Sequence, residues 1–145
     1  FFEQDMVGVK GYDAAILEVL TRHNAWIVSK SSNANTITHY LSTDSATITR
    51  VLTDLQQRYP EASISAQGVA MVAIIGSDIG KPGLVTDALR ALADANIDVI
   101  AMQHQIRNVD VQFVVDVAHF DAAVQTLHRV LIEVDDANAE GRCAA

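Results

Sequence analysis

The chain has 145 residues, of which 50% are apolar and 19% are charged, so it can build a packed core and is unlike a disordered chain. Its formal net charge of -8 argues against a nucleic acid or an anionic membrane as partner, since both require clustered Lys and Arg. Cys143 is the only cysteine, and no apolar run approaches the roughly 20 residues that cross a bilayer. We therefore expect a reducing, cytoplasmic compartment, and the start at Phe1, without Met or a signal peptide, predicts a piece of a longer protein.

The sequence repeats itself at an offset of 72 residues. Among other matches, the offset carries Gly8 onto Gly80, Gly11 onto Gly83, Asn24 onto Asn96, Ile27 onto Val99 and Ile37 onto Val109. Because one register spans both halves without a gap, we interpret the chain as a duplicated module. The first copy is expected at residues 1–67 and the second at 68–134, and residues 135–145 are expected to form a flexible tail.

The first module shows helical and strand periodicity in alternation. In chain order we expect an incomplete strand at 1–7, a helix from Gly11 to about His23, strands at 25–31 and 36–43 around the Asn33–Asn35 turn, a helix after Asp44 that stops before Pro60, and a closing strand at 62–66. In the first strand of the hairpin, Ala25 and Ile27 alternate with Trp26, Val28 and Lys30.

The second module repeats this order, and the pattern predicts an α+β fold of tandem ferredoxin-like βαββαβ modules. We expect strands at 69–76, 97–105 and 109–117, helices at 82–95 and 119–131, and a last strand at 131–134. Each module would place two helices on one face of a four-stranded antiparallel sheet. Ile97 and Val99 should face the helices, while Ile100 and Met102 should point away, like Trp26 and Val28 in the first module. Such outward apolar residues predict that sheets or edges of paired modules pack together.

A Gly-x-x-Gly turn precedes the first helix of each module, as Gly8-Val9-Lys10-Gly11 and Gly80-Lys81-Pro82-Gly83. Glycines allow a sharp bend and close approach of a ligand, and the helix that follows presents unpaired N–H groups suited to a carboxylate. An isolated pair of this kind is equally consistent with turn geometry alone. Its duplication favours a ligand site.

Polar side chains near the hairpins could add hydrogen bonds to a zwitterion, although they are also ordinary turn residues. In the first module they are Ser29, Ser31, Ser32, Asn33, Asn35 and Thr36, and in the second Gln103, Gln105, Arg107 and Asn108. The five histidines lack zinc-ligand spacing, and no Gly-x-Ser-x-Gly or phosphate-binding loop occurs. We therefore predict no catalytic residue, metal or cofactor in this chain, and a stand-alone ferredoxin-like enzyme is the weakest alternative.

Four segments carry a resemblance to a known family: residues 4–13, 27–38, 75–83 and 107–115. In them the chain resembles the ACT-domain family, and in particular the C-terminal regulatory region of an aspartokinase. The resemblance implies a parent enzyme that phosphorylates aspartate with ATP and Mg²⁺ through a kinase domain outside this chain. It implies a feedback sensor that binds threonine or lysine and forms a homodimer through its ACT modules.

Carried over position by position, the resemblance implies a set of effector-binding residues in both modules. These are Met6, Gly8, Val9, Lys10, Gly11, Tyr12, Asp13, Val28, Ser29, Asn35, Thr36, Ile37, Asp78, Gly80, Gly83 and Gln103. In lysine-sensitive relatives an acidic residue on the second strand helps to hold the effector, and its match here is Val28. The chain is in this respect similar to aspartokinases of ectoine synthesis, so threonine or no strong effector is the expectation. The alternative is an ACT dimerisation module without a ligand.

Overall fold

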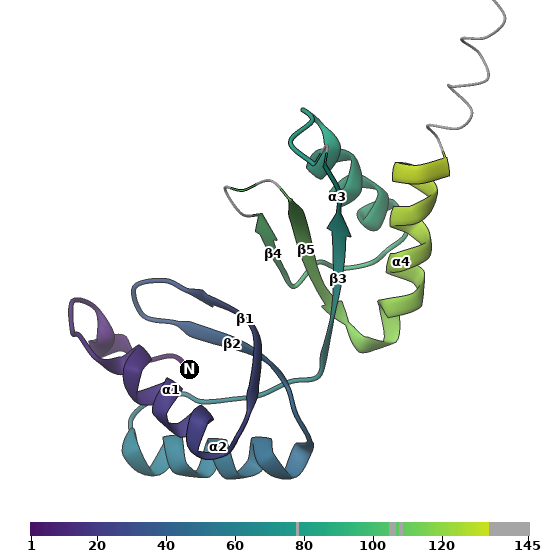
Figure 1. Ribbon diagram of the computed structural model, residues 1–145. Coiled ribbons are helices and arrows are strands. Elements are labelled where there is room, and N and C mark those ends of the chain that lie inside the picture. The colour runs from purple at the N-terminus through teal and green to yellow at the C-terminus, as the bar shows by residue number, and fades with distance from the viewer. Residues whose placement is uncertain (78, 105–106, 108, 134–145) are drawn as a thin grey trace, which may run out of the picture. The chain divides into compact units, whose positions relative to one another are not determined.

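The computed structural model describes residues 1–77, 79–104, 107 and 109–133, and the expected tail at 135–145 lies outside them. The chain divides into two compact units, the first being Phe1–Gln67 and the second beginning at Gly68 (Figure 1). Each unit is described by itself below. No helix among the described residues is long and apolar enough to span a membrane.

The first unit contains two helices and a two-stranded antiparallel sheet. Its elements are the 3₁₀ helix η1 (Gln4–Met6), α1 (Tyr12–Arg22), β1 (Trp26–Ser32), β2 (Ile37–Ser42) and α2 (Ser45–Arg58). Helix α2 begins where Asp44 Oδ1 accepts a hydrogen bond from the amide of Thr47 at 2.7 Å, and it ends before Pro60.

The outer strands of the first unit are shorter than the sequence predicts. Instead of a strand at 1–7, Phe2 forms single antiparallel bridges to Thr36 and to Ser63. The expected closing strand at 62–66 is reduced to that bridge at Ser63. The chain after Phe2 turns into η1, where the Glu3 side chain accepts from the amide of Asp5, and this local turn ends the pairing. The bridges nevertheless place the segments in the order of a split βαβ fold.

The second unit has a three-stranded antiparallel sheet in the order β3-β5-β4. Its elements are β3 (Val69–Ile75), α3 (Leu84–Asp94), β4 (Ala101–His104), β5 (Asp110–Asp116), the 3₁₀ helix η2 (Val117–His119), α4 (Phe120–His128) and a π-helical turn, η3 (Arg129–Glu133). The expected α+β class, with antiparallel strands and paired helices, is confirmed in both units.

Two strand predictions in the second unit are wrong. Residues 131–133 belong to η3 and not to a last strand, and Val134 lies outside the described residues. Residues 97–99 are also not part of β4, although Ile97 and Val99 do face the core as expected. Among the described residues β3 therefore pairs on one side only, with β5, and forms an edge of its sheet.

The repeat is visible in the geometry of the helices. The offset of 72 relates both the first and the last residues of α1 and α3, Tyr12 to Leu84 and Arg22 to Asp94. Each of these helices is followed by an asparagine with positive φ, 52° at Asn24 and 55° at Asn96. Such a left-handed residue ends a helix, and it tolerates Asn better than most side chains.

Each unit has its own apolar core between its helices and its sheet. In the first unit the core joins Ile16, Val19 and Leu20 of α1 to residues of β2 and α2, and Met6 belongs to it. In the second unit the residues of β5 that face the helices, Val111, Phe113 and Val115, are fully buried.

A β-bulge at Val28 changes the phase of β1. The register is shifted between Ile27 and Ser29, so the alternation that groups Lys30 with Trp26 does not hold. Lys30 instead lies opposite His39, and directly opposite residues share a face. That face is the one covered by α1, because the Lys30 ammonium reaches Asp13 of α1.

The second unit changes phase at the corresponding place, before β4. Met102 is 41% exposed, as the outward prediction requires, but it lies opposite the buried Phe113 and is therefore on the helix side of the sheet. The expectation that Met102 points away from the helices is therefore wrong, because its partner Phe113 is on the helix side. Ile100, Trp26 and Val28 are exposed as predicted, at 45%, 72% and 53%.

Candidate functional site

The turn between η1 and α1 is held open by two glycines. Gly8 has a φ of 78° and Gly11 a φ of 102°, a region that L-residues with side chains rarely adopt. Gly11 is the N-cap of α1 and offers no side-chain cap. Since the first amides of a helix have no partner within the helix, this turn presents N–H donors together with the positive end of the helix dipole.

The space around these bends is not filled by side chains. A Cβ built on Gly8 or on Gly11 would meet no atom within 4 Å. Val9 and Lys10 between them are exposed, and the Val9 amide donates to the carbonyl of Met6 at 3.0 Å, which fixes the bend. Both bends therefore leave room for a small group beside the backbone, at the turn where the sequence predicts a ligand site.

The second unit repeats only part of this arrangement. Gly83 caps α3 with a φ of 95° and likewise offers no side-chain cap. A Cβ on Gly83 would lie 3.7 Å from Oδ2 of Asp87, so this bend is closer to a carboxylate than its counterpart in the first unit. Gly80 is exposed, whereas Asp78 lies outside the described residues, as do Gln105 and Asn108. The bend at Gly83 is thus more crowded than the bend at Gly11.

The hairpin residues are engaged mostly in shaping the hairpin. Asn33 Oδ1 accepts from the amides of Asn35 at 3.1 Å and Thr36 at 2.9 Å, which makes Asn33 a turn residue. The carbonyl of Asn35 accepts from the amide of Glu3 at 3.0 Å, and the amide of Ile37 donates to the carbonyl of Phe1 at 2.8 Å. The hairpin is thereby tied to the segment that leads into the glycine turn.

Several predicted site residues lie in the core or in sheets. Met6 and Ile37 are buried at 6% and 5% exposure, so their side chains pack in the core. The Tyr12 ring stacks on Tyr59 at a centroid distance of 5.1 Å and also contacts Phe1. Val28 and Ser29 lie on β1, and Gln103 lies on β4 opposite Gln112.

Sequence reasoning did not foresee a polar cluster formed by Asp13, Lys30 and His39, called here the Asp13 cluster. Lys30 Nζ donates to Asp13 Oδ2 at 2.5 Å, and His39 Nε2 lies 3.9 Å from Asp13 Oδ1. Burial lowers the pKa of His39, while the negative charge of Asp13 acts in the opposite direction. The five histidines show no spacing signal, and only the bulge at Val28 brings Lys30 to His39.

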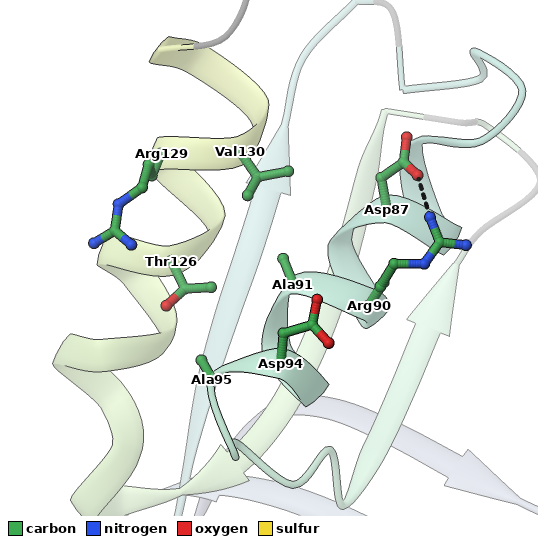
Figure 2. A pocket seen from close by; sticks show the side chains of 8 residues that line it. All are labelled: Asp87, Arg90, Ala91, Asp94, Ala95, Thr126, Arg129 and Val130. Carbon is green, nitrogen blue, oxygen red and sulfur yellow. Dashed lines mark hydrogen bonds and ion pairs between the residues drawn. The ribbon is translucent and has the colours of Figure 1, made fainter.

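A surface hollow of ≈ 400 Å³ lies in the second unit between α3 and the α4–η3 segment (Figure 2). Its polar wall includes Arg90, paired with Asp87 at 3.4 Å, but these side chains are 67% and 57% exposed. Such exposed pairs are well solvated and select a ligand weakly. We therefore favour the glycine turn as the candidate site.

Comparison with known proteins shows the family of the second unit. Residues 72–131 match the family model of the ACT domain. The chain is 38% identical over 135 residues to the aspartate kinase Ask_Ect of Stutzerimonas stutzeri, which covers 93% of this chain and 28% of that protein. The second unit is therefore an ACT domain, and the whole chain, called here the ACT region, is similar to an aspartate kinase.

Solved structures share the fold of this ACT region. The regulatory subunit of aspartate kinase from Thermus flavus has a TM-score of 0.70 at 13% identity, with 86% of each chain covered. The aspartate kinase of Clostridium acetobutylicum has a TM-score of 0.79 at 15% identity, over 89% of this chain and 31% of that one. The ACT region spans 86% of that regulatory subunit, whose fold it shares, and 28% of the curated relative.

Proposed function

We propose that the ACT region is the amino-acid sensor of an aspartate kinase, and that the glycine turn of the first unit holds the carboxylate of the effector. The observation that carries the proposal is the left-handed, uncapped N-cap at Gly11 with open space around it. Anions bind at such helix N-termini through backbone amides and the helix dipole. A free amino acid supplies the required carboxylate.

The side-chain environment favours threonine over lysine as the effector. Val28 is 53% exposed and carries no charge that could pair with an ammonium group. Asp13, in the first turn of α1, already binds Lys30. A second cation beside this pair would be repelled by the Lys30 ammonium, whereas a small uncharged side chain would not.

The parent protein in this proposal is an aspartate kinase whose ATP- and Mg²⁺-dependent kinase domain is its partner. The support is the relationship to Ask_Ect, of which the chain spans 28%. The effector would inhibit only as far as it binds one arrangement of the parent enzyme better than another, with a coupling of roughly 1 to 3 kcal/mol. We further propose a homodimer through the ACT modules, supported by the exposed Trp26 and Val28 on the sheet of the first unit.

Thermal unfolding followed by circular dichroism tests the effector site. A ligand that binds only the native state stabilises it by about 2.7 kcal/mol at one hundred times its Kd, so threonine should raise the melting temperature and lysine should raise it less. Gly11→Ala should abolish the rise, because its Cβ enters the open space at the turn. Gly83→Ala is the matched control, since it also places alanine at a left-handed N-cap, but in the other unit.

Two outcomes would contradict the proposal. One is a melting temperature that neither amino acid changes at millimolar concentration. The other is an equal loss of the ligand response in both glycine variants, which would reflect loss of fold and not of a site.

A second candidate function is that of an ACT dimerisation module without an effector. Its support is Val28 in place of an acidic residue, the feature on which the expected similarity to aspartokinases of ectoine synthesis rests, together with the relationship to Ask_Ect. This candidate predicts concentration-dependent association in sedimentation experiments and no response to amino acids. The effector titration above therefore separates the two candidates.

A further inference from the structure

The Asp13 cluster leaves two polar atoms buried without a hydrogen bond. Asp13 Oδ1 and His39 Nε2 are both inaccessible, and neither has a hydrogen-bond partner among the described residues. The two atoms are 3.9 Å apart, and the His39 side chain is only 6% exposed. Buried polar groups are nearly always hydrogen-bonded, so a facing pair that is almost in contact requires a physical account.

The second unit shows what the fold itself requires at these positions. The offset of 72 carries Asp13 onto Val85 and Lys30 onto Met102. Lys30 lies opposite His39, and Met102 lies opposite Phe113, which is fully buried. Val85 packs against the core of its unit.

The sibling module thus fills the same place with apolar side chains alone. Packing of helix on sheet does not need charge there. The ion pair of Lys30 with Asp13 is partly solvated, with side chains 37% and 43% exposed, and such pairs contribute little to stability, so the three ionisable groups are not explained by stability.

We infer that the Asp13 cluster is a proton-operated clasp between α1 and the β1–β2 hairpin. A proton bound at His39 Nε2 makes that nitrogen a donor facing Asp13 Oδ1, so the 3.9 Å gap closes into a charge-assisted hydrogen bond. No other reactant is needed, since the proton comes from water and returns to it. Asp13 then divides its two oxygens between Lys30 on β1 and His39 on β2.

The charged groups that face His39 from neighbouring elements, together with burial, set its pKa. Burial lowers the pKa of His39 from its usual 6.5, the Asp13 charge raises it, and the charges of Lys30 and of the Phe1 α-amino group lower it. The folded pKa is therefore below the unfolded one. The contribution of neutral His39 to the free energy of unfolding is fully present above the unfolded pKa. It is lost as the pH falls from the unfolded pKa through the folded pKa.

The consequence for sensing rests on the proposed function. Asp13 is the second residue of α1, next to the amides that would hold the effector carboxylate. Closing the clasp draws the first turn of α1 towards the hairpin, so effector binding should depend on whether His39 is protonated. The clasp is measured without any effector, so a failure of the clasp can be told apart from a failure of the proposed effector site.

The test is an NMR titration of the histidine ring protons, in which the His39→Gln variant identifies the His39 signal by its loss. In the wild-type chain His39 should titrate below the usual histidine pKa of about 6.5. Lys30→Met should raise its midpoint, because a nearby positive charge is removed, and Asp13→Asn should lower it. A His39 midpoint at or above the usual histidine value, or one that neither substitution moves, would overturn the inference.

A second measurement remains decisive where a single variant folds poorly. The triple variant Asp13→Val, Lys30→Met, His39→Phe gives the first unit the side chains of Val85, of Met102 and of Phe113, the residue that lies opposite Met102. The melting temperature of the wild-type chain should fall as the pH is lowered from about 7.5 to about 5, a range that extends from above the usual histidine pKa to well below it. This fall should be larger than that of the triple variant. An equal fall in both chains would contradict a clasp at this place.

Discussion

Truncation of a matched core leucine in each unit should destabilise that unit alone. Leu20 of α1 and Leu92 of α3 are related by the offset of 72 and are 2% and 0% exposed. Leu→Ala removes about 2.4 kcal/mol of transfer free energy, at about 0.8 kcal/mol per buried carbon, and leaves a cavity that brings the total to about 3–5 kcal/mol. A unit the size of Phe1–Gln67 has a total stability of roughly 3–10 kcal/mol, so either change removes a large share of it.

Native-state hydrogen exchange measures the effect for each unit separately. In Leu20→Ala the amides of α1 and β2 should lose protection while those of α3 and β5 keep theirs, and Leu92→Ala should do the reverse. Circular dichroism in urea gives the total loss. A loss below about 1 kcal/mol would refute the tight packing inferred for these positions, and equal loss of protection in both units would refute two separate cores.

Two further changes test other contacts. The hydrogen bond from His23 at 2.8 Å, followed by the charges of His23 and Arg22, keeps the pKa of Asp54 below its usual value, so the stability that Asp54 contributes is complete above its unfolded pKa and is lost as the pH falls through its folded pKa. Asp54→Asn should therefore reduce the loss of stability at acidic pH. An unchanged loss would show that the pair of Asp54 with His23 contributes nothing. Trp26→Ser should weaken self-association in sedimentation experiments if the exposed sheet of the first unit forms the dimer, and unaltered association would place the interface elsewhere.

The parts of the fold that follow local periodicity were predictable. The offset of 72 relates both ends of α1 to those of α3, and Gly8 and Gly11 alone located the glycine turn. Helix periodicity and turn residues depend on near neighbours in sequence, which explains this success.

The parts that depend on strand pairing were not predictable from one sequence. The bulge at Val28 reverses which face Lys30 occupies, and no local pattern announces it. The Asp13 cluster follows from that bulge and was missed with it. Residues 131–133 were misassigned because a short apolar run fits a strand as well as a helical turn.

Among the described residues one side of β3 pairs with no strand, and this has a practical consequence for handling the protein. Its sequence, Val-Ala-Met-Val-Ala-Ile-Ile, holds no charge and no proline, and Ile75 at its end is 80% exposed. An unpaired strand edge of this composition can pair with strands of other molecules and promote cross-β aggregation. This edge should therefore limit the solubility of concentrated samples, whether or not an effector occupies the glycine turn.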